Sequence, residues 1–355
     1  MTELDVGIHG VATAYPLHCF RQDEIMAKAA EVFGHRPELM ERMAKTYGNA
    51  GVKQRNSCVP LEWYRSRHGW PERAALFEQH AVKLLAEAGR LALADAGVAA
   101  RDVAATVTVS STGIVTPSLD SLLQQPLGLS PTVQRLPVFG LGCAGGVIGL
   151  SRAAAIAKAM PGEWVLFLCT ELCGLTFRPG DDSKANIIAT TLFGDGAAAV
   201  VLRAGEGASR ARIRAWGEHT WPGTRDIMGW TVEDDGLGVV FSRSIPALVR
   251  DMMRPVTDAF LASKGLAQAD LKGLIVHPGG ERVLEALEDC YGFARGGLVE
   301  ARAVLADHGN MSAVTVLAVL RRTLVKAGAR GARGPHLMAA LGPGFSVGMC
   351  LLDLH

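Results

Sequence analysis

An internal repeat restricts the fold of this chain more than any other feature of its sequence. The segment LADAGVAARDVAATVTVS, which begins at Leu93, aligns without a gap with LASKGLAQADLKGLIVHP, which begins at Leu261, at an offset of 168 residues. The same offset carries Cys143 onto Met311, and both positions lie in a glycine-containing turn that opens a helix of small and branched residues. Two features that recur at one offset in the same order predict two similar halves.

The pattern within each half is typical of an α/β fold, because apolar runs bounded by Gly and Asp alternate with helix-period segments. The predicted strands are residues 104–111, 163–170, 197–204, 273–278 and 345–354, and the predicted helices include residues 73–96, 145–159 and 312–327. The polar stretch RAGEGASRAR, residues 203–212, suggests the boundary between the two halves of the chain. We therefore predict an N-terminal half over residues 1–205 and a C-terminal half over residues 206–355.

Composition excludes several classes of partner. The chain of 355 residues has 49% hydrophobic residues and a formal net charge of +1, so it can bury a large core and does not attract nucleic acid by charge. No apolar run reaches the roughly 18 residues that a membrane span needs, and the N-terminus lacks the pattern of a signal peptide. The seven cysteines are scattered and form no CxxC pair. We predict a cytoplasmic protein with free thiols, no membrane span and no metal site.

Three chemistry-bearing residues are predicted to meet where the halves join. Cys143 lies between glycines at the start of one helix, Asn310 at the start of the equivalent helix, and His277 at the end of the repeated strand. A thiolate at a helix N-terminus is stabilised by the unpaired N–H groups, and a nearby His can hold it as a thiolate–imidazolium pair. The Asn amide can donate a hydrogen bond to an enolate. Glycines beside the cysteine allow backbone and acyl group to approach closely.

Each of these residues also has an ordinary structural interpretation. A buried free cysteine is most often an inert small hydrophobe. Asn310 could serve only as the N-cap of its helix, which Asn does well. Only the conjunction of all three at the junction of two similar halves favours catalysis.

Four short motifs occur in one order along the chain: GCAGG (142–146), VHPGG (276–280), GNMS (309–312) and GPGFS (342–346). Together with ELCGLTFR and LFGDGAAA they resemble the type III polyketide synthases, the chalcone-synthase-like branch of the thiolase superfamily. The resemblance covers essentially the whole chain and implies a homodimer with a thiolase-like five-layered αβαβα architecture. A beta-ketoacyl-carrier-protein synthase III usually continues its His with Gln-Ala-Asn, whereas Pro-Gly-Gly follows His277 here. A hydroxymethylglutaryl-CoA synthase would need a catalytic glutamate that we do not find.

The resemblance implies a reaction as well as a fold. Cys143 would carry an acyl group taken from acyl-CoA, and His277 would keep the thiol ionised. Malonyl-CoA would lose CO₂, and His277 with Asn310 would stabilise the enolate that attacks the acyl-cysteine. Repeated rounds and cyclisation would give a pyrone or resorcinol. No cofactor is expected, since the CoA thioesters are substrates.

The resemblance also implies substrate-binding positions. Phe193 matches the first gatekeeper phenylalanine of the family, while Val239 stands where a second is expected and Phe241 could partly replace it. Trp230 occupies a cavity position that is glycine in plant enzymes, which together with the segment VVFSR favours bacterial alkylpyrone or alkylresorcinol synthases with a fatty acyl starter. The other implied cavity positions are Cys173, Leu175, Thr176, Ala189 and Ser312.

Two further implied positions lie outside the cavity. Thr116 would be the tip of a loop that reaches into the partner subunit. Arg42 and Lys45 fall near the basic patch that binds CoA, although they could also be a solvated helix face. Alternatives that stay open are a single-round synthase III-like enzyme, a short or aromatic starter, and an inactive homologue that acts as a partner subunit.

Overall fold

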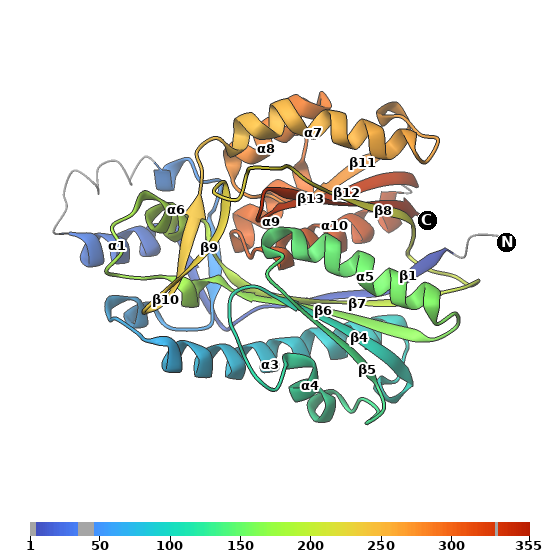
Figure 1. Cartoon of the computed structure of the whole chain (residues 1–355), viewed down its shortest axis with the longest axis horizontal. Coiled ribbons are helices and arrows are strands. Elements are labelled where there is room, and N and C mark those ends of the chain that lie inside the picture. The colour runs from blue at the N-terminus through green and yellow to red at the C-terminus, as the bar shows by residue number, and fades with distance from the viewer. Residues whose placement is uncertain (1–4, 35–45, 331–332) are drawn as a thin grey trace.

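The computed structural model describes residues 5–34, 46–330 and 333–355, in which helices and sheets alternate in five layers (Figure 1). Helices α3 (Trp70–Ala96) and α4 (Leu119–Leu127) cover one outer face, and α7 (Ile245–Ala262) and α8 (Glu281–Tyr291) cover the other. Between the two sheet layers lie α5 (Gly145–Ala159) and α10 (Ala313–Arg330). The predicted five-layered α/β architecture is confirmed.

Nine strands of the described residues form one continuous sheet. In order across the sheet they are β11 (Gly273–Val276), β12 (Gly334–Gly342), β13 (Ser346–Leu354), β8 (Ala211–Thr220), β1 (Val6–Ala14), β7 (Asp195–Ala204), β6 (Trp164–Leu172), β4 (Val103–Ser110) and β5 (Gln134–Phe139). The only link between the two halves of this sheet is the pairing of β1 with β8, which runs from Val6 opposite Ile213 to Ile8 opposite Ala211 in the described chain. Because this link is short, each half keeps a sheet layer of its own.

The two halves repeat the same strand order and direction. In the first half β1 pairs antiparallel with β7, β7 antiparallel with β6, and β6 parallel with β4. In the second half β8, β13, β12 and β11 follow the same sequence of directions. The offset of 168 carries Gly145, the first residue of α5, onto Ala313, the first residue of α10. The repeat seen in the sequence is therefore a structural duplication.

Close packing of α5 against α10 depends on missing side chains. A Cβ at Gly146 would lie 2.2 Å from the carbonyl oxygen of Ala313, and a Cβ at Gly145 would lie 3.3 Å from Ala313 Cβ. The glycines after the cysteine therefore allow the N-terminal ends of the two central helices to lie close together. From the sequence these glycines are expected to have a different role, the close approach of the acyl group. Most of α5 is buried, as expected for a helix between two sheets.

The remaining elements gather at one end of the molecule, at the left of Figure 1. They are the helices α1 (Gln22–Phe33) and α6 (Lys184–Leu192) and the hairpin of β9 (Met228–Glu233) with β10 (Gly236–Phe241). The strands β2 (His18–Arg21) and β3 (Gln54–Ser57) form a second hairpin, and α9 (Val299–His308) packs against β3. None of these was predicted, because short or part-exposed elements carry a weak hydrophobic period.

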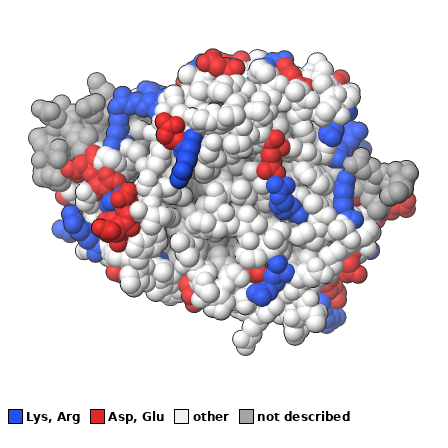
Figure 2. All heavy atoms as spheres, viewed as in Figure 1, with Lys and Arg blue, Asp and Glu red and all other residues white. Residues whose placement is uncertain are grey.

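The distribution of charged side chains on the surface agrees with the small net charge of the chain. Figure 2 shows Lys and Arg interspersed with Asp and Glu, with broad uncharged areas between them, on the face in view. Among the helices of the described residues, none is both long and apolar enough to cross a membrane.

Candidate active site

Cys143 lies in a tight turn at the start of the central helix α5. The turn, Gly142–Ala144, is a single 3₁₀ turn that leads directly into α5, and Cys143 is buried. Gly142 has a φ of +49°, its N–H donates to Ser111 Oγ at 2.9 Å, and a Cβ there would lie 2.6 Å from the Pro343 ring. Glycine is therefore required at 142, and it places the thiol beside the unpaired N–H groups of the helix N-terminus.

His277 follows the last residue of β11. Its backbone N–H donates to the carbonyl of Ala339 on β12 at 3.0 Å, which extends the ladder between these strands and fixes the residue. Its side chain is buried, and neither ring nitrogen has a hydrogen-bond partner within the part of the chain that the structure describes. A buried unpaired polar group costs free energy, so it is expected where a substrate supplies the partner.

Asn310 precedes α10 and is held by three segments. Its N–H donates to Leu192 O at 2.7 Å and its carbonyl accepts from Gly194 N at 3.0 Å, so its backbone bridges the end of α6. Its side-chain Oδ1 accepts from Ser312 N at 2.8 Å, and Nδ2 donates to Gly279 O at 3.2 Å. The amide thus caps the start of α10 and still has one N–H available for a ligand.

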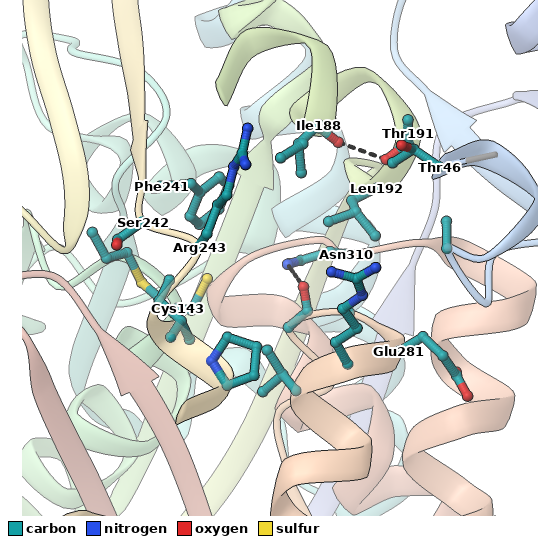
Figure 3. Close-up of a pocket in the computed structure, with 18 of the residues that line it drawn as sticks. Thr46, Cys143, Ile188, Thr191, Leu192, Phe241, Ser242, Arg243, Glu281 and Asn310 are labelled. Atoms are coloured by element: carbon teal, nitrogen blue, oxygen red, sulfur yellow. Dashed lines mark hydrogen bonds between the residues drawn. The ribbon is translucent and has the colours of Figure 1, made fainter. Parts of the chain in front are cut away.

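Cys143, His277 and Asn310 line one cavity of about 380 Å³. Figure 3 shows Cys143 and Asn310 on one side of it, facing Ile188 and Leu192 of α6. The cavity lies where the starts of the two central helices meet, so the duplication brings the three residues together although they are far apart in the sequence.

Burial changes the protonation of the thiol and the imidazole. It raises the pKa of Cys143 to about 12, against a hydrogen bond from Ser312 that lowers it, and it lowers the pKa of His277 to about 3. Burial therefore opposes the ionisation of each group taken singly, and the thiolate–imidazolium pair that the sequence suggests stays a prediction. The physical reason is that both charged forms lose their hydration in the buried site.

Comparisons with known proteins identify the family of this chain. The model for "Chalcone and stilbene synthases, N-terminal domain" matches residues 8–208, and the model for their C-terminal domain matches residues 214–354. The chain belongs to the chalcone and stilbene synthase family. Members of this family are type III polyketide synthases, which are CoA-dependent acyltransferases that condense thioesters with loss of CO₂ and are typically homodimers.

Individual relatives share the whole length of this polyketide synthase. A putative chalcone synthase of Bacillus subtilis (strain 168) is 36% identical, with 98% of each chain covered. The 1,3,6,8-tetrahydroxynaphthalene synthase of Streptomyces peucetius subsp. caesius is 35% identical over 99% of this chain and 94% of its own. The crystal structure of the 1,3,6,8-tetrahydroxynaphthalene synthase of Streptomyces coelicolor A3(2) has a TM-score of 0.92 at 28% identity, covering 98% of this chain and 99% of that one.

The other predicted substrate-binding residues of this type III polyketide synthase do not all line the catalytic cavity. Phe241 lines the catalytic cavity. Trp230 on β9 packs against Phe193, with 6.1 Å between their ring centroids, and Val239 pairs with Trp230 across the hairpin. Four residues line a second cavity behind α6, and these are Cys173, Thr176, Ala189 and Phe193.

The last predicted positions are placed as follows. Leu175 is buried, and its carbonyl accepts a hydrogen bond from Arg73. Ser312 is buried behind Cys143 and donates to Glu171 at 3.3 Å. Thr116 is exposed, in the loop between β4 and α4. Arg42 and Lys45 lie outside the described residues.

Glu171 is a buried charge that sequence reasoning missed. It lies on β6, where Oε2 accepts from Ser111 N at 3.0 Å and Thr112 Oγ1 at 2.8 Å, and Oε1 accepts from Ser312. Burial raises the pKa of Glu171 to about 7, and its charge raises the pKa of Cys143. The available signal was a carboxylate inside the apolar run EWVLFLCTELC.

We expect Glu171→Gln to remove a pH dependence of stability. The pKa of Glu171 is higher in the folded protein than the usual value of 4.5, so its stabilising contribution is complete below about pH 4.5 and is lost as pH rises through 7. Gln cannot ionise. The free energy of unfolding of the variant relative to the wild type should therefore rise by roughly 2 kcal/mol between pH 5 and pH 8, as measured by urea denaturation. A difference that is the same at both pH values would contradict this assignment.

Three exposed cations stand at the mouth of the catalytic cavity. Lys184, Arg243 and Arg282 line it, and none of them has an ion pair or hydrogen bond within the described ranges. The neighbouring Glu281 is paired with Arg302. Free cations beside an apolar cavity suit the phosphates of CoA. The sequence did not reveal them, because they come from three separate segments.

Proposed function

We propose that this type III polyketide synthase takes a fatty acyl-CoA starter, extends it repeatedly with malonyl-CoA and cyclises the product to a pyrone or resorcinol. The observation that carries the proposal is the wall of the catalytic cavity, which is largely apolar around the three reactive side chains. Its larger apolar members include Ile188, Leu192, Met228, Phe241, Ile245, Val283 and Leu341. Such a lining favours an alkyl chain over a polar starter.

Loading of the starter begins from neutral groups. The Cys143 thiol gives its proton to His277 as Sγ attacks the thioester carbonyl, so charge appears only as the bond forms. The C–S bond to CoA then breaks, and His277 returns the proton to the departing CoA thiolate. Free CoA leaves and the acyl group stays on Cys143. The unpaired ring nitrogens of His277 leave it available for this transfer.

Extension follows at the same three residues. The carboxylate of malonyl-CoA leaves as CO₂, and the electrons of that C–C bond form the enolate of acetyl-CoA. The free N–H of Asn310 and an N–H of neutral His277 donate to the enolate oxygen. The apolar surroundings favour loss of the carboxylate charge. The enolate carbon then attacks the acyl carbonyl, and Cys143 leaves as a thiolate that takes up a proton or the lengthened chain.

A starter series tests this function. The enzyme is incubated with malonyl-CoA and saturated acyl-CoAs of increasing length, or with an aromatic acyl-CoA, and the products are analysed by mass. We expect pyrones or resorcinols extended at least twice, with higher kcat/KM for fatty than for aromatic starters. A thioester extended only once would indicate a single-round synthase. Tetrahydroxynaphthalene, the product named for the Streptomyces relative, could also form from malonyl-CoA alone. That result would contradict the proposed use of a fatty acyl-CoA as the starter. No turnover at all would indicate an inactive homologue.

The cations at the cavity mouth are proposed to bind CoA phosphates. We expect the double substitution of Arg243 and Arg282 by Ala to raise KM for malonyl-CoA about tenfold with kcat unchanged, because the contacts are the same in ground and transition states. Arg295→Ala is the control, since Arg295 pairs with Asp289 on the surface. Steady-state kinetics in which KM stays constant while kcat falls would contradict this role.

We also propose that the chain dimerises through the free edge of its sheet. Strand β5 ends the sheet, and it exposes Leu136 and Phe139, while Ile114 is exposed in the loop that carries Thr116. An uncovered edge strand with exposed apolar side chains suits pairing with a second copy. Light scattering should give a molecular mass of twice the chain mass of 37.5 kDa. The measured mass of the Phe139→Lys variant should fall toward that of the monomer. A wild-type monomer at micromolar concentration would contradict the proposal.

A further inference from the structure

We propose that Arg55 is a positioning residue for Asn310, which it holds in place by fixing the C-terminal end of α6. Arg55 lies within β3 and is buried, and it is not among the described residues that line the catalytic cavity. It therefore acts through the backbone that it binds. The inference rests on the proposed function, because it assumes that Asn310 stabilises the enolate.

The guanidinium of Arg55 binds the last carbonyl groups of α6. Its Nη1 donates to the carbonyl of Thr190 at 2.7 Å and to that of Phe193 at 3.1 Å. Its Nη2 donates to the carbonyl of Thr191 at 2.9 Å and also to Gln22 Oε1. Carbonyls at the end of a helix have no N–H of the same helix to bind, and they carry its partial negative charge. One planar group thus fixes the end of α6 at three points.

Arg55 is a buried cation whose hydrogen-bond partners in the described chain are all neutral oxygens. Burial lowers the pKa of Arg55 to about 10, so the side chain still carries its charge at pH 7. Only Nε has no partner within the described residues. A buried charge is costly unless polar groups surround it. The end of α6 therefore cannot move away from Arg55 without leaving the guanidinium unsatisfied.

The same end of α6 binds the backbone of Asn310. The Asn310 N–H donates to the Leu192 carbonyl at 2.7 Å, and the Gly194 N–H donates to the Asn310 carbonyl at 3.0 Å. Figure 3 shows Leu192 near Asn310 at the cavity. Two glycines allow this approach, since a Cβ at Gly194 would lie 2.3 Å from the His308 carbonyl oxygen and a Cβ at Gly309 would lie 2.6 Å from that of Leu192. A shift of the end of α6 therefore shifts Asn310.

Strand β3 also holds the segment that leads into Asn310. The N–H of Lys53, just before β3, donates to the Ala306 carbonyl at 2.9 Å, and Asn56 Oδ1 lies 3.0 Å from His308 Nδ1. The strand thus connects the end of α6 with the end of α9, and Asn310 lies where these two ends meet. A displacement of about 1 Å at a catalytic group can lower the rate about 10²-fold. The connection through β3 is therefore placed to control the donor that Asn310 offers.

Arg55→Lys tests this role, because Lys keeps the charge but lacks the planar fork that binds three carbonyls together. We expect kcat for decarboxylation of malonyl-CoA to fall about tenfold. KM for malonyl-CoA and the rate at which acyl-CoA loads Cys143 should each change less than twofold. Arg73→Lys is the matched control and should alter none of these, since Arg73 is also buried and donates to the carbonyls of His68 and Leu175.

A double-mutant cycle with Asn310→Ala separates positioning from a general loss of structure. Because Arg55 acts through the Asn310 amide, Arg55→Lys should lower decarboxylation less than twofold once that amide is absent. The measurements are CO₂ release and intact-mass loading, with folding followed by circular dichroism. An equal fall in the presence and absence of the amide overturns the inference, and so does an equal fall in loading and decarboxylation.

The outcomes also separate this inference from the proposed function. Decarboxylation at the wild-type rate in Asn310→Ala contradicts the role that the proposed function gives to Asn310. A fall in Asn310→Ala together with a wild-type rate in Arg55→Lys contradicts the inference alone.

Should Arg55→Lys fail to fold, Gln22→Ala takes its place. Gln22 is part-exposed, and it accepts from Arg55 and donates to the Thr191 carbonyl at 3.0 Å. We expect Gln22→Ala to lower decarboxylation about threefold when Asn310 is present and less than 1.5-fold in Asn310→Ala. A wild-type rate in Gln22→Ala, or an equal fall with and without the Asn310 amide, overturns the inference.

Discussion

Cys143→Ala should lower product formation by about 10⁴-fold or more, because it removes the only side chain that the proposed reaction uses as a nucleophile. Acyl-CoA should no longer add an acyl mass to the protein. Release of CO₂ from malonyl-CoA should continue at a measurable rate, since His277 and Asn310 remain to stabilise the enolate. The fold should persist, because Ala is only slightly smaller than Cys and the neighbouring packing is carried by glycines 142, 145 and 146.

Cys350→Ala is the matched control for this variant. Cys350 on β13 is also buried, and burial also raises its pKa to about 12, but it does not line the catalytic cavity. It should keep normal loading and turnover. Condensation that survives in Cys143→Ala, measured by product mass, would overturn the assignment of the nucleophile.

Asn310→Asp should lower the rate of malonyl-CoA decarboxylation by about 10²- to 10³-fold, the usual cost of losing one donor to a developing oxyanion. The carboxylate keeps the acceptor that holds Ser312 N at 2.8 Å, so the start of α10 is preserved. What the variant loses is the Nδ2–H donor. Loading of Cys143 from acyl-CoA should change only a few-fold.

Comparison with Asn310→Ala separates two causes of that loss. Asp adds a negative charge near the enolate, whereas Ala does not, so an equal fall in both variants assigns the effect to the missing donor. The measurement is CO₂ release under saturating malonyl-CoA together with intact-mass loading. Decarboxylation at the wild-type rate in both variants would limit Asn310 to capping α10.

Local hydrophobic patterns predicted five of the nine described strands of the large sheet, β4, β6, β7, β11 and β13, whereas β1, β5, β8 and β12 were missed. Predicted strands and helices such as 104–111 and 145–159 differ from β4 and α5 by one residue or less at each end. The hairpin of β9 and β10 escaped prediction, since its residues are mostly part-exposed and its turn is short. Glu171 escaped because a lone carboxylate in an apolar strand does not reveal its partners.

The sequence alone determined the duplication and the α/β class and predicted Cys143, His277 and Asn310 as the catalytic residues, because repeats and motifs are local properties of the chain. Tertiary structure decided what surrounds them. The protonation of Cys143 and His277 follows from burial by residues distant in sequence, the cations at the mouth come from three segments, and the two faces of α6 separate two cavities. Desolvation and cavity shape depend on side chains that only folding brings together, so they have no signature in any short stretch of sequence.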